Sequence, residues 1–289
     1  MMSVQRGLIL LSAVGAVVVP MVMQTPGGPA VSDGPPDPKQ LYSKSDPEYY
    51  LTSEKLIYVR PGLNITVEDL QIPADRKPVV ELTFTDDLGQ PLDRAGVLTP
   101  GAISASFILS WYDAELRDYV AYTVRTQTSP ITGESAVQAS ADSGGTWTDV
   151  ELGRAIYTFR TALPEGFDGS KTHTLGIYSS RNLTEILEKS YYANVEHDFR
   201  PDGGEVVEVW DAFADETCNS CHEQLAFHGG SRRDVKLCVL CHNKQTLDPD
   251  TGNTVDMKVM IHKIHFGANL PSVQAGTPYQ IIGNRQAVH

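Results

Sequence analysis

One five-residue pattern, CxxCH, occurs twice in this chain, at residues 218–222 (CNSCH) and 238–242 (CVLCH), and uses all four cysteines of the sequence. Two thiols about one helical turn apart can add to the two vinyl groups of one porphyrin. A histidine directly after the second thiol can then bind the iron from one face. We therefore predict two attached haem c groups. Their thioether residues would be Cys218, Cys221, Cys238 and Cys241, and their proximal iron ligands His222 and His242.

The same cysteines allow two other interpretations. Their spacing also reads C-x₂-C-x₁₆-C-x₂-C, which is typical of a four-cysteine zinc site. Such a site would leave His222 and His242 without a role, although the chain has only 8 histidines among 289 residues. Paired thiol–disulfide exchange sites are a third interpretation, but these normally follow a βαβ pattern that the sequence lacks. The adjacent histidines favour haem.

Six of the eight histidines lie in the last 85 residues, so sixth iron ligands are available. The candidates are His228, His262, His265 and His289, with Met257 and Met260 as thioether alternatives. Iron held by two histidines has no open coordination position and suits electron transfer. His228 follows His222 by only six residues and cannot easily wrap around the same porphyrin. We therefore assign His228 to a different haem from that of His222.

Residues 255–267 (VDMKVMIHKIHFG) are predicted to form a helix that ends at Gly267. His262 and His265 are three residues apart, so they share one face of this helix and could reach two different irons. The alternative is an ordinary surface helix, with both histidines in water and Met257, Met260 and Ile264 packed inward.

The first 45 residues are predicted to carry the chain out of the cytoplasm. Arg6 is the only charge of residues 1–23, and the apolar run 7–23 is typical of a secretory signal peptide or an uncleaved N-terminal anchor. Because the first cysteine is Cys218, no lipid anchor on a leader cysteine is expected. Residues 24–45 are rich in proline and glycine and are predicted to be a linker.

Residues 46–204 are predicted to form a mainly β domain, an Ig-like or Greek-key sandwich, because short apolar runs alternate with turn residues. These runs are residues 55–59 (KLIYV), 78–84 (PVVELTF), 103–112 (ISASFILSWY), 118–125 (DYVAYTVR), 155–163 (AIYTFRTAL) and 172–180 (THTLGIYSS). Residues 183–189 (LTEILEK) have a helical period. His173 and His197 are expected to be ordinary structural or surface residues. Residues 140–147 (SADSGGTW) fit a single Asp-box pattern, which we interpret as a turn, since a propeller would repeat it.

Residues 205–289 follow a turn-rich boundary (PDGG, 201–204) and are predicted to be a loop-rich and short-helix-rich multihaem segment. This segment has few aliphatic runs, so other apolar material, such as haem, should fill its interior. The chain as a whole has a formal net charge of −13. So acidic a protein would be repelled by phosphates, and nucleic acid is excluded as a partner.

Residues 218–243 (CNSCHEQLAFHGGSRRDVKLCVLCHN) and 256–272 (DMKVMIHKIHFGANLPS) resemble decahaem outer-surface cytochromes of the MtrC and OmcA type. Residues 157–181 (YTFRTALPEGFDGSKTHTLGIYSSR) resemble the end of that family's N-terminal β domain. The resemblance implies alternating β and pentahaem domains, with bis-histidine haems that pass electrons to extracellular acceptors such as metal oxides or flavins. It also implies redox partner proteins, including an outer-membrane porin–cytochrome complex, and a location in the periplasm or at the outer membrane of a Gram-negative cell.

The chain departs from that family in having two attachment motifs instead of ten, which indicates an N-terminal fragment. Some of its histidines would then bind haems attached to other sequence. We expect an electron carrier, not an enzyme. The alternatives are a multihaem reductase, which needs an iron with one vacant face, and an exported β-sandwich binding module with a four-cysteine zinc site.

Overall fold

The computed structural model describes residues 38–283. The predicted signal peptide or anchor, most of the predicted linker, and His289 lie outside the described residues. Among the helices of the described part, none is both long enough and apolar enough to cross a bilayer.

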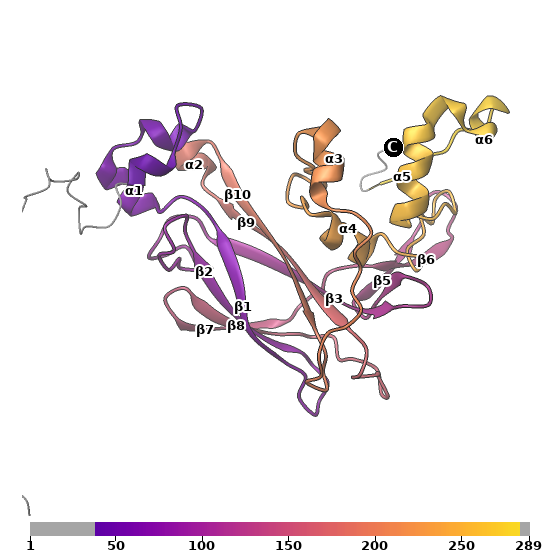
Figure 1. The fold of residues 1–289 in the computed structure, drawn as a ribbon, viewed down its shortest axis with the longest axis horizontal. Coiled ribbons are helices and arrows are strands. Elements are labelled where there is room, and N and C mark those ends of the chain that lie inside the picture. Colours follow the sequence, from indigo (N-terminus) through magenta and orange to yellow (C-terminus); the bar gives the residue numbers. More distant parts are fainter. Residues whose placement is uncertain (1–37, 284–289) are drawn as a thin grey trace, which may run out of the picture. The chain divides into compact units, whose positions relative to one another are not determined.

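The first half of the chain forms antiparallel sheets, as predicted (Figure 1). One four-stranded sheet has the order β1 (Asn64–Gln71), β2 (Val79–Thr85), β8 (Arg154–Thr158) and β7 (Thr146–Glu151). The other has the order β10 (Ser190–Phe199), β9 (His173–Asn182), β3 (Ile103–Asp113) and β4 (Asp118–Ala121). Strands β5 (Val124–Thr128) and β6 (Ser135–Ala139) form a separate hairpin.

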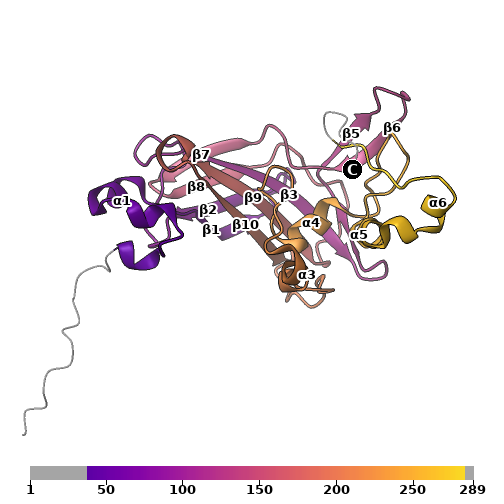
Figure 2. The same ribbon diagram turned by 90° about the horizontal axis from the view of Figure 1, so that it is seen from above.

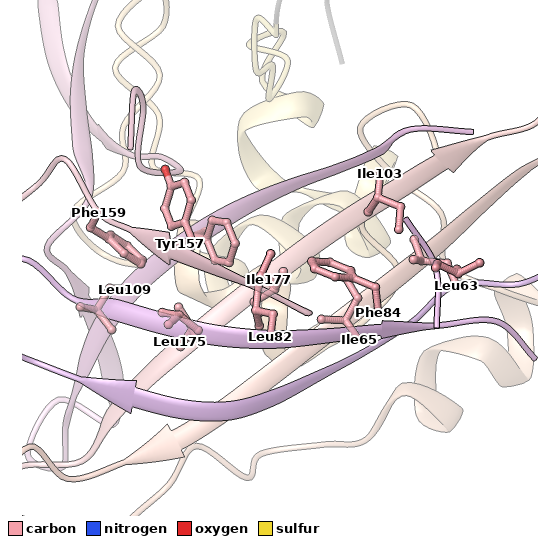
Figure 3. Close-up of a cluster of buried hydrophobic side chains, with 14 of the residues drawn as sticks. Leu63, Ile65, Leu82, Phe84, Ile103, Leu109, Tyr157, Phe159, Leu175 and Ile177 are labelled. Atoms are coloured by element: carbon pink, nitrogen blue, oxygen red, sulfur yellow. The ribbon is translucent and has the colours of Figure 1, made fainter. Parts of the chain in front are cut away.

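The main core lies between the two four-stranded sheets (Figure 3). Leu82 and Phe84 come from the first sheet, and Leu109, Leu175 and Ile177 come from the second. Each is at most 1% exposed, and burying such a side chain stabilises a fold by about 1.5–3 kcal/mol. Leu82 and Phe84 on β2, like Leu175 and Ile177 on β9, are two residues apart, so each pair points to the same face of its strand.

Strands β3 and β9 are buried on both faces. Phe107 and Leu109 on β3 point into the main core, whereas Ile108 between them belongs to a second apolar cluster. On β9, Gly176 pairs with Ile108 and faces the same side. This explains why residues 107–110 are buried without interruption, since this part of the strand is covered on both faces.

The prediction of a strand at residues 55–59 is wrong, because this segment belongs to α1 (Ser53–Val59). Thr52 caps the helix by accepting a hydrogen bond from Lys55 N at 3.2 Å. Leu56 and Val59, three residues apart, are the two buried positions, which is a helical period and not a strand period.

Two other predicted elements differ from the structure only in their boundaries. The predicted run 118–125 divides into β4 and β5, and the predicted helix at 183–189 is the short α2 (Thr184–Leu187). Two short 3₁₀ helices precede α1, at Pro38–Leu41 and Pro47–Tyr50.

Hydrogen bonds fix both the predicted turn at residues 140–147 and His173. Asp142 of the Asp-box pattern accepts hydrogen bonds from Tyr157 Oη at 2.8 Å and from the backbone of Arg160 and Thr161 at 3.0 Å. His173 is fully buried and hydrogen-bonded through both ring nitrogens, to Lys171 O and Tyr122 Oη, at 2.9 Å each.

The last third of the described chain consists of short helices, again as predicted. They are α3 (Asp215–His222), α4 (Val235–Cys241), α5 (Met257–Phe266), a 3₁₀ turn (Gly267–Asn269) and α6 (Pro271–Gln274). Helix α4 lies against β3, β9 and β10 (Figures 1 and 2). Its side chains Leu237 and Leu240 join Ile108 and Tyr119 in the second apolar cluster. Part of the core that the C-terminal segment lacks is thus supplied by the β-sheet.

Candidate haem-attachment site

The first CxxCH motif lies on α3, which has no buried residue. Cys218 and Cys221 are three residues apart in this helix, so their side chains are one turn apart, and His222 is its last residue. Asp215 at the start of α3 accepts a hydrogen bond from Val235 N at 2.7 Å. This bond joins the helix of the first motif to the first residue of α4.

The second motif lies on α4, which is firmly packed. Asp234 caps the helix through a hydrogen bond from Lys236 N at 2.8 Å, and Leu237 and Leu240 are buried against the sheet. The Lys236 ammonium donates to Asp198 on β10 at 2.5 Å. Cys238 and Cys241 are therefore presented by a helix whose position the β domain determines.

Each motif histidine lies beside a second imidazole. The rings of His222 and His265 have centroids 6.0 Å apart, and those of His242 and His228 are 5.9 Å apart. An imidazole nitrogen binds a first-row metal at about 2.0–2.1 Å, so two rings on opposite sides of one metal have centroids roughly 6 Å apart. Both pairs therefore have the spacing of a bis-histidine iron site.

Direct ring contact would allow similar distances, but the hydrogen bonds of the rings favour metal ligation. The Nδ1 atom of His265 donates to Ile261 O at 2.9 Å, and that of His242 donates to Val255 O at 3.0 Å. Because a carbonyl can only accept, Nδ1 carries the proton and the Nε2 lone pair is free. Ligating histidines in metalloproteins commonly have this arrangement.

His228 reaches His242 through an unusual turn. Its φ angle is +51°, and Gly229 and Gly230 also have positive φ angles of +77° and +87°. Left-handed backbone is unfavourable for a non-glycine residue and is concentrated at functional positions. The two glycines allow the chain to turn back, and Phe227 and Arg232 close the turn with a bridge.

The helix predicted around His262 and His265 is confirmed as α5, which ends at Gly267 as expected. His262 is exposed, and its Nδ1 donates to Lys258 O at 2.6 Å. No ring contact brings a second histidine to His262 within residues 38–283. Met257 packs against the second apolar cluster, which supports a packing role for this residue.

A cavity of about 410 Å³ adjoins the second motif. Its lining includes Cys238, Cys241, His242 and His228. The β domain contributes Ile108, Tyr178 and, from the β5–β6 hairpin, Arg125 and Gln138. Apolar walls, two thiols and two imidazoles around one cavity are a donor set that fits a covalently attached haem. The contribution of the hairpin to this cavity was not predicted, since no sequence signal connects it to residues 238–242.

Burial shifts the pKa values of the two cysteines and the histidine of the second motif. Desolvation raises the pKa of Cys238 to about 12, with a further contribution from the charge of Asp234. Desolvation also raises the pKa of Cys241 to about 11, which the positive charges of Arg232 and Arg125 oppose. The pKa of His242 is lowered by burial, which favours the neutral imidazole that binds metals.

The zinc alternative does not fit this arrangement. A four-cysteine site requires the four thiols to converge on one point. All four cysteines are described, yet no three His, Cys, Asp or Glu side chains of residues 38–283 gather as a metal-binding group.

Comparison with known proteins agrees with the motif pattern. Residues 211–287 match the family model "Outer membrane cytochrome MtrC/MtrF-like, domains II/IV". The multiheme cytochrome MtrC of Shewanella baltica (strain OS185) is 26% identical over 163 residues, which cover 50% of this chain and 22% of that protein. The chain therefore spans about a fifth of the length of this curated relative.

The fold is similar to that of a solved structure, the outer membrane decaheme cytochrome OmcA. The TM-score is 0.59 at 21% identity, and the match covers 78% of this chain and 37% of that chain. OmcA shares the order of β-sheets followed by short helices. Together, these matches confirm the resemblance of the chain to MtrC/OmcA-like outer-membrane multihaem cytochromes.

Proposed function

We propose that this chain is an electron carrier that holds two c-type haems, one at each CxxCH motif. The observation that carries this proposal is the pairing of each motif histidine with a second imidazole at about the spacing of a bis-histidine iron: His222 with His265 at 6.0 Å, and His242 with His228 at 5.9 Å.

A c-type haem in such a site supplies a one-electron Fe(III)/Fe(II) couple. The chain's own residues would bind this haem and orient it. The cysteines would tether the porphyrin, and the paired imidazoles would ligate its iron. The Nδ1 hydrogen bonds of His265 and His242 to backbone carbonyls fix the ring orientation. The bond from Val235 N to Asp215 keeps the two motif helices adjacent, which favours electron transfer between the sites.

The paired imidazoles also favour a carrier over a reductase. A multihaem reductase needs an iron with one vacant face, on which the substrate binds. Each motif histidine lies beside a second imidazole, so two histidines would ligate each iron and would leave no open position for nitrite or a similar substrate.

The cellular role that we propose follows from the relatives and from the leader. The matched family and OmcA are named as outer-membrane cytochromes, and residues 1–23 have the pattern of a secretory signal or anchor. We therefore propose that the chain is exported to the periplasm or cell surface. There it would exchange electrons with redox partner proteins, such as a porin–cytochrome complex, and with metal oxides or flavins.

His262 has the hydrogen bond of a ligating histidine but no described partner ring. We propose that it serves as the sixth ligand of a haem attached to sequence outside this chain. His289, which lies outside the described residues, is a second candidate for that role.

Expression of the whole chain in bacteria that mature c-type cytochromes tests the proposal. Intact-mass measurement and a pyridine haemochrome assay should find two covalent haems per chain, and electron paramagnetic resonance should show low-spin iron. The variant Cys218→Ala/Cys221→Ala and the variant Cys238→Ala/Cys241→Ala should each retain one haem. A colourless product, from cells that mature a reference cytochrome c, would refute the proposal.

A further inference from the structure

The cavity beside the second motif contains two arginines without an acidic partner. Arg125 lies on β5, and Arg232 lies in the turn before α4. Neither guanidinium has a carboxylate within 4.0 Å among the described residues, although the protein as a whole is strongly acidic. Other arginines, such as Arg94 and Arg200, do form such ion pairs.

Both arginines are oriented by contacts that leave hydrogen-bond donors free. Arg125 donates from Nη2 to Gln138 on the neighbouring strand of the hairpin at 3.1 Å. Arg232 uses Nη1, which donates to Ser231 Oγ at 2.8 Å. Its guanidinium lies 3.7 Å from the ring centroid of Tyr178. This stacking holds the charge at the cavity wall, while Nε and Nη2 of Arg232 make no hydrogen bond to the described residues.

The acidic residues of the same cavity already accept hydrogen bonds from other groups of the protein. Asp248 Oδ2 accepts hydrogen bonds from Thr251 Oγ1 at 2.6 Å and from Ile282 N at 2.9 Å. Asp250 Oδ1 accepts from Ser129 Oγ at 2.5 Å. A further anion in the cavity would be repelled from these two carboxylates and attracted to the two guanidiniums.

The haem proposed for this cavity carries two propionate carboxylates. Placing a carboxylate in a partly buried site is unfavourable unless a cation or strong donors meet it, and arginine suits carboxylates because its donors match both oxygens. We propose that Arg125 and Arg232 bind the propionates of the haem attached to Cys238 and Cys241. This inference rests on the proposed function, because it requires a haem at the second motif.

The test uses the whole haem-loaded chain and the variants Arg125→Gln, Arg232→Gln and their combination. Removing a positive charge next to the haem leaves a propionate charge uncompensated, which disfavours the added electron. The reduction potential of one haem should therefore become more negative, with the largest shift in the double variant, while the other haem keeps its potential. Spectroscopic redox titration measures both. The variant Cys218→Ala/Cys221→Ala, which keeps only the second haem, assigns the shift.

Arg117→Gln is the matched control. Arg117 is exposed in the β3–β4 turn, outside the cavity lining, and its side chain forms no ion pair with any residue between 38 and 283. It should leave both potentials unchanged. A second signature is independent of potential. Redox-difference infrared spectra with ¹³C-labelled propionates should show altered carboxylate bands in the Arg125 and Arg232 variants but not in the control.

Two results would overturn the inference. The first is a double Gln variant with both haems and parental potentials and infrared bands. The second applies if the double Gln variant loses the haem of the second motif. The variant Arg125→Lys/Arg232→Lys keeps both positive charges and should then restore attachment of this haem. Failure to restore it would show that the positive charges are not what holds the haem. If the parent chain attaches no haem, the proposed function fails as well. A loaded parent with insensitive variants refutes the arginine assignment alone.

Discussion

Leu240 on α4 lies directly over Gly176 on β9: a Cβ atom at position 176 would lie 2.3 Å from Leu240 Cδ1 and 2.8 Å from Leu237 Cδ1. The absence of a side chain at one strand position thus lets the helix of the second CxxCH motif rest on the sheet. The cavity beside the second motif depends on this contact, because Leu237 of the same helix lines it together with Ile108 of the sheet.

Gly176→Ala should therefore push α4 away from the sheet. We expect a loss of about 1–3 kcal/mol in the free energy of unfolding, as for overpacked cores, together with less haem at the second motif. Chemical denaturation and a haem count per chain measure the two effects. Gly169→Ala is the control, since a Cβ there would meet no atom closer than 3.5 Å. Equal stability of the two variants would contradict the proposed packing role.

The two histidines of α5 offer a matched comparison. Both are exposed, and both donate Nδ1 to the carbonyl four residues earlier, but only His265 faces a motif histidine. His265→Ala should convert the first haem to a high-spin form that binds carbon monoxide when reduced. His262→Ala should leave the spectrum of this chain unchanged. Optical and paramagnetic resonance spectra distinguish the outcomes, and identical spectra for the two variants would contradict the pairing of His222 with His265.

Glu196 on β10 should make the fold less stable at alkaline pH. Its Oε1 atom is buried without a hydrogen-bond partner. Burial raises its pKa to about 8, with a further contribution from the charge of Asp234. Lys236 partly offsets this effect, whereas Asp215 and Asp198 add to it. Because the folded pKa lies above the ordinary value of 4.5, the folded state holds this proton more tightly than the unfolded chain.

The contribution of Glu196 to stability is therefore fully present below pH 4.5 and is lost as the pH rises to about 8. Glu196→Gln should remove this dependence and stabilise the chain at pH 9 by on the order of 1–3 kcal/mol. Thermal unfolding at pH 5 and pH 9 measures the effect. The exposed Glu165→Gln serves as control. A Glu196→Gln variant that is no more stable than the parent at pH 9 would argue against a buried, strained carboxyl group.

Asp142 should show the opposite dependence on pH. Burial disfavours its charge, but hydrogen bonds from Thr161, Arg160 and Tyr157 outweigh this effect and lower its pKa. Its contribution is thus present above its unfolded pKa of about 3.8 and is lost as the pH falls through the lowered folded value. Asp142→Asn should destabilise the chain at pH 7 by about 1–3 kcal/mol.

Denaturation curves at pH 7, compared with those of Ser143→Ala, would measure the contribution of Asp142. Ser143 is the exposed neighbour of Asp142 in the same turn, and its replacement should have little effect. Haem content should be unchanged in both variants, because the turn lies outside the attachment motifs. Equal stability of the two variants at pH 7 would show that the Asp142 hydrogen bonds contribute little.

Local patterns in the sequence were sufficient for the elements that depend on neighbouring residues. The spacing of Cys218, Cys221 and His222 within one helical turn, and the helix that ends at Gly267, both follow from local geometry. The prediction of a strand at residues 55–59 was wrong for a local reason as well. Its apolar residues suit either a strand or a helix, and the cap at Thr52 together with burial of Leu56 and Val59 selected the helix.

The amino-acid sequence by itself determined the two attachment motifs, the class of cofactor that they suggest, and the order of β-sheets before short helices. Only the tertiary structure decided which imidazoles meet, His265 with His222 and His228 with His242, and that Arg125 of a distant hairpin reaches the second motif. The physical reason is that periodicity and spacing report on residues within a few turns of one another. Residues far apart in the sequence are brought together instead by tertiary packing, such as that of α4 on the sheet, where Gly176 leaves room for Leu240.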